Sequence, residues 1–392
     1  MHILFVALQD DGILDEVRKY RNQNEIEQIL IILDSLHKNN KIKIKLVCFA
    51  DSILYKKACS LGISTLPIKN KNPNGLLTRF FLWNWQRKCK KIIIQTFGEE
   101  SVQLGHQIYK MRNDGSVVLS HAFFFAPPSQ EICLSKEMIS AKYIIYGSRY
   151  IRKRILSIWR DHNAKVMLPT ERELLIHITP SINLSQYTNI KYNRFDSVER
   201  YIFCMGGSLL PKSGARMMLR AMSAMWQRQD LPHWEVRMLG GGPRFEEILL
   251  EAKNLGVESR LSILGDQEFN NILSNCHVWV APGSSAEECP DTLWAGFAAN
   301  IPVICSDSPL HLERLGCSDY EENISSKINM AILVSENSPQ DLAKAMMHIM
   351  QYPELCKKLC IKANERNIYV KSGDMANSVN ILYETWLRNL GS

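Results

Sequence analysis

Residues 261–306 read LSILGDQEFNNILSNCHVWVAPGSSAEECPDTLWAGFAANIPVICS, and this stretch decides the fold of the chain. Apolar runs at 261–264, 278–280 and 303–305 lack any alternation of polar and apolar residues, and the segments between them have helical periodicity. Strands that are apolar on both faces are typical of a parallel sheet, whose crossover helices cover both sides. The stretch therefore predicts three parallel strands joined by helices within an α/β domain.

A loop rich in small and acidic residues, 283–291, follows the second of these predicted strands. In parallel sheets, ligands bind beyond the carboxyl ends of the strands, where helix N-termini present free N–H groups and a partial positive charge. The loop lies at that edge of the predicted sheet. We therefore expect it to contribute to a ligand site.

The order of residues in and after this loop resembles the nucleotide-sugar site of the retaining glycosyltransferases of family 4, also called glycosyltransferases group 1. The matching positions are Pro282, Ser284 or Ser285, Glu287, Cys289-Pro290, Ala298, Pro302 and Val303. The resemblance implies an α/β fold of the GT-B class, in which two Rossmann-like domains face each other across a cleft. Two positions depart from the family pattern: Ala295 replaces a second glutamate that binds the nucleotide ribose, and Asn300 replaces a glycine.

A second segment of the family pattern, residues 206–214, follows another predicted strand. The family has a Gly-Arg pair here and a lysine about five residues later, which offset the charge of the leaving diphosphate without a metal. Lys212 keeps the spacing of that lysine, whereas Gly207 occupies the position of the arginine. Losing one charge-assisted contact costs about 1.5–3 kcal/mol. Another base, Arg149 or Arg244, would have to supply the charge of the missing arginine.

The resemblance also implies which residues contact the donor. They are Gly206, Gly207, Lys212, Gly241, Glu287, Glu288, Asp291 and Thr292. Glu287 would position the sugar hydroxyls, or Glu288 after a one-residue slip, and the backbone N–H groups near Asp291 and Thr292 would face the phosphates. The residues expected in catalysis are Lys212, Glu287 and His121.

The first half of the chain also alternates predicted strands with helical segments, which indicates a Rossmann-like domain. Apolar runs typical of strands lie at 3–8, 46–49, 66–68, 92–96, 117–120 and 143–146. No G-x-G-x-x-G follows the first run, which argues against a dinucleotide-binding dehydrogenase. We expect an acceptor-side domain at 1–185 and a nucleotide-sugar-binding domain at 186–372. A final helix, 373–392, would pack back on the first domain through Ile381, Leu382, Trp386 and Leu390.

The predicted strand 117–120 ends immediately before His121. A histidine just past a parallel strand would point into the crevice and hydrogen-bond a sugar hydroxyl of donor or acceptor. The alternative is a structural histidine whose ring nitrogens have partners within the protein. The other nine histidines show no metal-ligand spacing, so we expect no metal site.

Length and composition describe an ordinary globular protein of two domains, with 392 residues of which 46% are hydrophobic and 22% charged. Eleven cysteines without paired spacing and no secretory signal predict reduced thiols in a cytoplasmic protein. The net charge of +7 favours anionic partners such as nucleotides or a lipid surface. No apolar run approaches the roughly 18 residues of a membrane span.

One segment, residues 75–91 (GLLTRFFLWNWQRKCKK), combines four aromatic and five basic residues with no acidic residue. One interpretation is a surface helix that leans on anionic lipid and brings the enzyme to a membrane-bound acceptor. The other is an ordinary helix before a strand, with its aromatic residues in the core and its basic groups in water.

The resemblance and these patterns predict a metal-independent hexosyl- or heptosyltransferase. It would move a sugar, with retention, from a nucleoside-diphosphate sugar to a saccharide or lipid-linked glycan, in cell-surface polysaccharide or lipopolysaccharide synthesis. No cofactor besides this co-substrate and no nucleic acid partner are expected, and the enzyme would work in the cytoplasm, at the inner face of the membrane. Two alternatives stay open: a catalytically silent relative that binds a nucleotide sugar or a partner protein, and a nucleotide-sugar epimerase.

Overall fold

The computed structural model divides into two compact units, Met1–Ser181 with Val370–Ser392, and Ile182–Tyr369. The boundaries predicted at 185/186 and 372/373 lie a few residues from these divisions. The structure describes residues 2–8, 16–39, 41–69, 76–112, 114–162, 175–181, 200–206, 209, 213–242, 244–264, 273–283, 290–317, 330–366 and 372–390. No helix in these ranges is long and apolar enough to cross a membrane.

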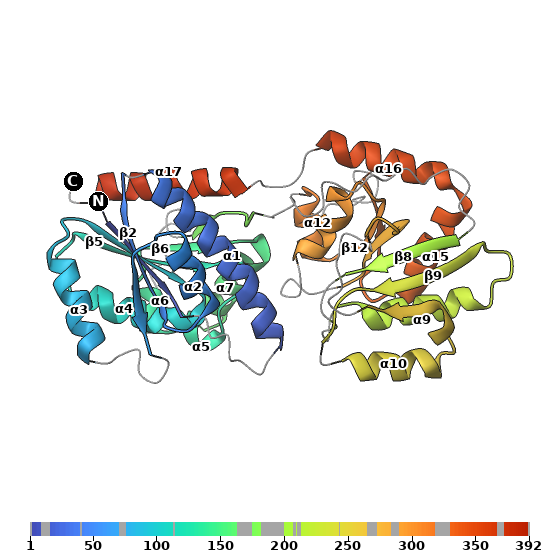
Figure 1. Ribbon diagram of the computed structural model, residues 1–392, viewed down its shortest axis with the longest axis horizontal. Helices are drawn as coiled ribbons and strands as arrows, with labels where there is room; N and C mark the ends of the chain where they lie inside the picture. The colour runs from blue at the N-terminus through green and yellow to red at the C-terminus, as the bar shows by residue number, and fades with distance from the viewer. Residues whose placement is uncertain are drawn as a thin grey trace. The chain divides into compact units, whose positions relative to one another are not determined.

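The first unit is built on a seven-stranded parallel sheet with the order β3-β2-β1-β4-β5-β6-β7 (Figure 1). Its strands are β1 (His2–Ala7), β2 (Lys43–Phe49), β3 (Thr65–Ile68), β4 (Ile92–Phe97), β5 (Val117–Phe123), β6 (Tyr143–Tyr146) and β7 (Leu175–His177). The central strands β4 and β5 are buried along their whole length. Burial on both faces explains why their sequences are apolar without alternation.

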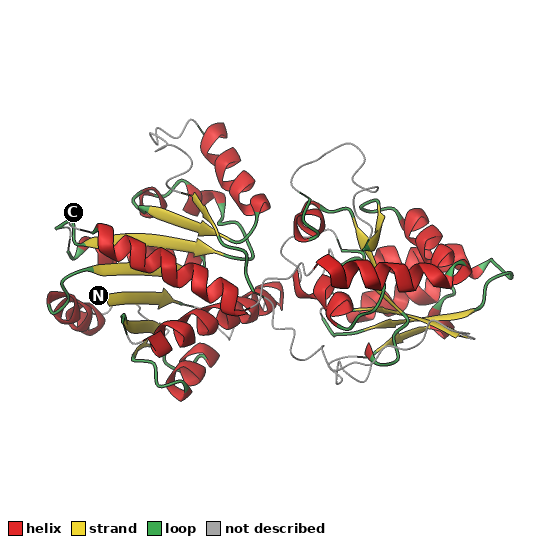
Figure 2. Ribbon diagram, turned by 90° about the horizontal axis from the view of Figure 1, so that it is seen from above, coloured by secondary structure: helices red, strands yellow, loops and turns green. Residues whose placement is uncertain are grey.

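Helices cover both faces of this sheet. Figure 2 shows helices, in red, lying over strands, in yellow. One core packs against α1 (Glu16–Asn39), α2 (Ile53–Ser60) and α17 (Ser372–Asn389). The opposite core packs against α3 (Leu76–Arg87), α4 (Val102–Lys110), α5 (Gln130–Cys133), α6 (Lys136–Ile139) and α7 (Arg149–Asp161). A short 3-10 helix, η1 (Glu99–Ser101), precedes α4.

Helix α17 returns from the far end of the chain to complete the first core. The hydroxyl of the fully buried Tyr383 donates to Oε1 of Gln95 in β4 at 3.2 Å, and the Trp386 ring stacks on Tyr143 with centroids 4.1 Å apart. Leu390 is also buried, whereas Ile381 is 67% exposed. The expectation that Ile381 belongs to the packing face is therefore wrong, because Asn380 and Tyr383 face α1 and the sheet instead.

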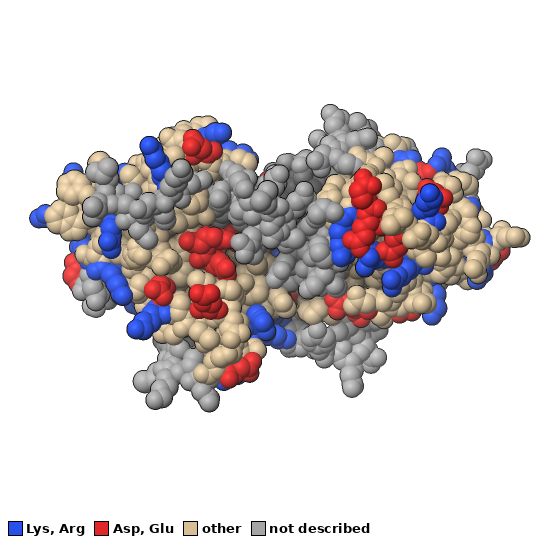
Figure 3. Space-filling view, turned by 90° about the horizontal axis from the view of Figure 1, so that it is seen from below, with Lys and Arg blue, Asp and Glu red and all other residues tan. Residues whose placement is uncertain are grey.

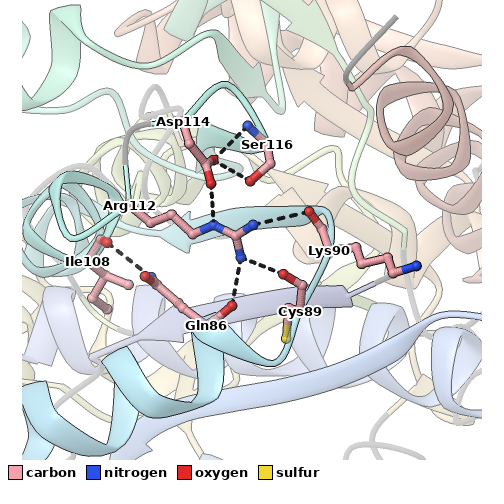
Figure 4. A network of polar contacts seen from close by, with 7 residues as sticks. All are labelled: Gln86, Cys89, Lys90, Ile108, Arg112, Asp114 and Ser116. Carbon is pink, nitrogen blue, oxygen red and sulfur yellow. Dashed lines mark hydrogen bonds and ion pairs between the residues drawn. The ribbon is translucent and has the colours of Figure 1, made fainter.

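The C-terminal end of α3 is held by a partly buried polar network (Figure 4). The Arg112 guanidinium donates to the carbonyl oxygens of Gln86, Cys89 and Lys90, and its Nε lies 2.8 Å from an Asp114 carboxylate oxygen. The Gln86 side chain in turn donates to the carbonyl of Ile108 in α4 at 3.0 Å. Arg112 therefore donates to one carbonyl in the last turn of α3 and to two carbonyls just beyond the helix. Its positive charge lies near the negative end of the helix dipole, where a cation is stabilising.

Replacing Arg112 by methionine should lower the free energy of unfolding by about 1.5–3 kcal/mol, because the part-buried carbonyls of Gln86 and Cys89 lose hydrogen bonds to a charged group. Urea unfolding measures the change. Arg228→Met is the matched control. Arg228 pairs with Asp230 on an exposed turn, so its loss should cost less than about 1 kcal/mol. Equal effects of the two substitutions would contradict the capping role.

The second unit has a six-stranded parallel sheet with the order β10-β9-β8-β11-β12-β13. Its strands are β8 (Arg200–Met205), β9 (His233–Met238), β10 (Leu261–Ile263), β11 (Val278–Ala281), β12 (Val303–Ser306) and β13 (Ala331–Val334). Helices α9 (Ala215–Trp226), α10 (Phe245–Asn254) and α15 (Pro339–Gln351) pack on one core, and α12 (Pro290–Ala298) and α13 (Pro309–Arg314) on the other. Residues of α16 (Pro353–Arg366) enter both cores. The prediction of two Rossmann-like sheets is confirmed.

Candidate active site

The carboxyl edge of the second sheet gathers the segments that the sequence singles out. Gly206 follows β8, Gly240 and Gly241 follow β9, and Pro282-Gly283 follows β11. Because neighbouring strands of this sheet are parallel, all of these turns leave from the same edge.

Gly214 joins two of these segments by close backbone contact. It has a left-handed conformation (φ 84°) at the start of α9, and a Cβ at this position would lie 2.7 Å from the backbone of Pro282 and Gly283. Only glycine fits both the conformation and the contact. The segments 206–214 and 283–291, predicted as two parts of one site, therefore meet here.

The glycine turn after β9 adds a third segment. The Leu209 N–H donates to the carbonyl of Gly241 at 2.8 Å, and Gly242 packs against the Leu209 backbone, where a Cβ would lie 2.9 Å from its nitrogen. Among the described residues, no atom lies within 4 Å of the corresponding position at Gly241. Its backbone therefore borders open space, which a ligand can approach closely.

A buried hydroxyl fixes the position of the loop after β11. The Ser306 hydroxyl, at the end of β12, donates to the carbonyl of Gly283 at 2.6 Å. His311 Nδ1 lies 2.9 Å from this hydroxyl oxygen and 3.1 Å from the Ser306 carbonyl. Since the hydroxyl hydrogen is engaged and a carbonyl only accepts, Nδ1 carries the ring proton. This cluster could not be predicted from sequence, because Gly283 is 23 residues away from Ser306 in the chain.

The start of α12 contributes backbone donors. Asp291 and Thr292 lie in its first turn, whose N–H groups have no partners within the helix. α9 begins nearby without any side-chain cap. Two helix N-termini with their partial positive charges therefore lie at the edge that carries the glycine turns.

The two departures from the family pattern have different physical consequences. Ala295 is fully buried in the core beneath α12, so this position offers no group to a ligand. Asn300 adopts a left-handed conformation (φ 55°), and its side-chain oxygen accepts from Asn364 Nδ2 at 2.9 Å. Asparagine is among the residues that tolerate this conformation best, so it replaces the family's glycine at little cost.

Several predicted site residues fall outside the described ranges: Gly207, Lys212, Glu287 and Glu288. Of the two arginines expected to supply a missing charge, Arg244 precedes α10 and its Nε lies 3.2 Å from Glu247, and Arg149 is an exposed residue at the start of α7 in the first unit. Among the described residues, no group of three or more His, Cys, Asp and Glu side chains is placed to hold a metal ion.

On the face drawn in Figure 3, basic and acidic side chains of the described residues are interspersed on both units. The net charge of +7 is therefore not concentrated there.

His121 does not lie beyond its strand. β5 continues to Phe123, and the His121 ring is fully buried beside Thr96, its register partner in β4. Nε2 donates to the Glu137 carbonyl at 3.2 Å, so Nδ1 is unprotonated and accepts from the Thr96 hydroxyl at 2.7 Å. The expectation that His121 points into a crevice is wrong. With both ring nitrogens engaged, it ties α6 to the sheet.

Burial lowers the pKa of both His121 and His311 to about 4. In the unfolded chain a histidine titrates near 6.5, so between these values the unfolded state binds more protons and stability falls as the pH falls. For each of the two histidines, the free energy of unfolding should therefore fall by about 2 kcal/mol when the pH is lowered from 7 to 5.

Urea unfolding at the two pH values tests this expectation. The loss between pH 7 and pH 5 should shrink by about 2 kcal/mol in His311→Asn and in His121→Gln. His37→Asn, at an exposed position of α1, is the control. A loss that stays the same in both buried variants would contradict the assignment of neutral rings.

Comparisons with known proteins agree with this arrangement. Residues 189–366 match the family model of Glycosyl transferases group 1. A search of curated proteins finds no match.

Solved structures are similar over both units. A glycosyltransferase from Rickettsia africae ESF-5 has a TM-score of 0.71 at 14% identity, over 99% of each chain. Alr3699/HepE of Anabaena in complex with UDP has a TM-score of 0.72 at 13% identity, over 98% of this chain and all of the other. The lipopolysaccharide outer core galactosyltransferase WaaB has a TM-score of 0.60 at 14% identity, over 93% and 98%. The chain has the fold of these proteins, GT-B.

Proposed function

We propose that this chain, which carries a glycosyl transferases group 1 domain in a GT-B fold, transfers a sugar from a nucleoside-diphosphate sugar to a hydroxyl of a saccharide or lipid-linked glycan. The observation that carries the proposal is the meeting of three glycine-bearing turns and two helix N-termini at one edge of the second sheet. Backbone N–H groups arranged in this way suit a diphosphate.

In the proposed reaction, the bond between the sugar's anomeric carbon and the diphosphate oxygen breaks, and a bond from the acceptor oxygen forms on the same face of the sugar. The acceptor proton passes to the departing diphosphate, which makes a protein base unnecessary. Lys212 and the N-termini of α9 and α12 stabilise the charge that develops on the diphosphate. Glu287, or Glu288, positions the sugar hydroxyls.

We assign the hexosyl- or heptosyltransferase class to this reaction and place it in the synthesis of cell-surface polysaccharide or lipopolysaccharide, in the cytoplasm at the inner face of the membrane. HepE, which has the same fold, is described with UDP and with UDP-glucose, and WaaB as a lipopolysaccharide galactosyltransferase. UDP-sugars are therefore the first donors to test.

A second candidate is a catalytically silent protein that binds a nucleotide sugar. It is favoured by the burial of Ala295, which leaves the position of the family's ribose-binding glutamate without a polar group.

A panel of UDP-, GDP- and ADP-sugars tests both candidates. Release of nucleoside diphosphate supports the transferase, and calorimetric binding without release supports the silent protein. Conversion of the donor sugar without release would indicate an epimerase. A folded sample that neither binds nor turns over any donor would overturn the proposal.

A further inference from the structure

Helix α3 in the first unit exposes large aromatic side chains to solvent. Phe80 is 57% exposed, Phe81 55% and Trp83 43%. The interpretation of residues 75–91 that placed these aromatic residues in the core is therefore wrong for all three. Only Trp85 packs partly against the core.

α3 exposes these aromatic residues although it also has a face that packs against the protein. Leu82, Gln86 and Cys89 are buried at helical spacing and hold α3 against the sheet. The hydrogen bonds from Gln86 to α4 and from Arg112 to the end of α3 fix the helix in this orientation. Phe80, Phe81 and Trp83 thus form a second apolar surface, on the outside of a helix whose inner residues already pack against the protein.

Exposed basic groups lie in the same segment. Arg79, Arg87, Lys88 and Lys90 are all exposed, and no acidic residue occurs between residues 75 and 91. The Arg87 guanidinium lies 4.6 Å from the centre of the Trp83 ring, so at least this cationic group is in contact with the exposed aromatic residues. We call the exposed residues Arg79, Phe80, Phe81, Trp83, Arg87, Lys88 and Lys90 the α3 surface.

We propose that the α3 surface docks on the head groups of an anionic phospholipid bilayer. Aromatic rings with basic neighbours suit the boundary between acyl chains and head groups, and lysine and arginine are drawn to anionic lipid. A protein that binds the α3 surface would need both an apolar pocket and acidic groups. An anionic bilayer supplies apolar chains and acidic head groups over an area of any size. The surface explains how the proposed transferase reaches a lipid-linked acceptor.

Sedimentation with vesicles tests this proposal. The protein should bind vesicles that contain phosphatidylglycerol in phosphatidylcholine, should bind pure phosphatidylcholine much less, and should be released by salt. Lys88→Gln with Lys90→Gln should weaken binding about 10- to 30-fold, since each basic residue near an anionic surface contributes about fivefold. Phe80→Ala with Phe81→Ala and Trp83→Ala should weaken binding by at least about tenfold.

Matched variants separate the surface from general charge and apolar area. Lys56→Gln with Lys57→Gln removes the same charge from the exposed side of α2 in the same unit, and Leu250→Ala with Ile361→Ala removes exposed apolar groups from the second unit. Both should bind vesicles like the parent protein. Since the α3 substitutions are at exposed positions, their urea unfolding curves should match the parent.

Several results would overturn the proposal: equal binding to neutral and anionic vesicles, equal loss in the control variants, or no vesicle binding at all. A change of oligomeric state in the aromatic variant without a change in vesicle binding would identify a second copy of the chain as the occupant instead. The proposal rests on the proposed function only for the acceptor. Because vesicle binding is measured without donor, its failure leaves the donor panel unaffected.

Discussion

Replacing Lys212 by alanine is expected to lower the rate of donor turnover by about 10²–10³-fold, because a charge that acts on the departing diphosphate is removed from the transition state. The effect should appear mainly in kcat, since the interaction strengthens as the bond breaks. Release of nucleoside diphosphate from the best donor of the panel measures it.

Lys253→Ala serves as the control, because Lys253 is an exposed residue in the last turn of α10 in the same unit. Its substitution should leave turnover unchanged. If the two variants turn over donor at the same rate, Lys212 has no part in the mechanism.

Gly214→Ala is expected to lower the free energy of unfolding by about 2–5 kcal/mol. The left-handed conformation contributes about 1–2 kcal/mol, and the clash of the new Cβ with the Pro282–Gly283 backbone contributes about 1–3 kcal/mol. Because that clash displaces the loop at the candidate site, donor affinity should fall as well. Urea unfolding and calorimetry with the best donor measure the two effects.

Gly256→Ala isolates the contact. Gly256 has a similar conformation (φ 68°), but in the part of the chain that the structure describes no atom lies within 4 Å of the position of a Cβ. Its substitution should cost only about 1–2 kcal/mol and leave donor affinity unchanged. Equal losses of stability and equal donor affinities in the two glycine variants would contradict the inference that the contact at Gly214 positions the loop of the candidate site.

The central strands could be predicted from sequence, because burial on both faces produces unbroken apolar runs. The predicted strand 143–146 coincides with β6. β5 was predicted too short, since His121 interrupts the apolar run, and only its hydrogen bonds to Thr96 and to the Glu137 carbonyl make it suitable for the core. The edge strands β7 and β13 were missed, although each pairs in parallel with its neighbour, whereas the equally short edge strands β3 and β10 were predicted.

Within the candidate site, spacing along the chain predicted the glycine turns and the start of α12, because parallel strands bring successive turns to one edge. The role of Ser306 and His311 could not be predicted, since it depends on a hydrogen bond to Gly283 across 23 residues. His121 is the opposite kind of error. Its position near the end of a predicted strand suggested a ligand contact, but the ring is buried and both ring nitrogens have partners within the protein.

Helix α17 also affects the order in which the protein acquires its structure during synthesis. The sheet of the first unit leaves the ribosome early, but Tyr383, Trp386 and Leu387 belong to its core and are translated after the whole of the second unit. Until these residues emerge, the side of the nascent sheet that α17 shares with α1 and α2 must stay partly uncovered. Residues 182–369 form a contiguous unit and have no such requirement. In this chain the unit translated second is therefore the first whose sequence is complete and able to fold.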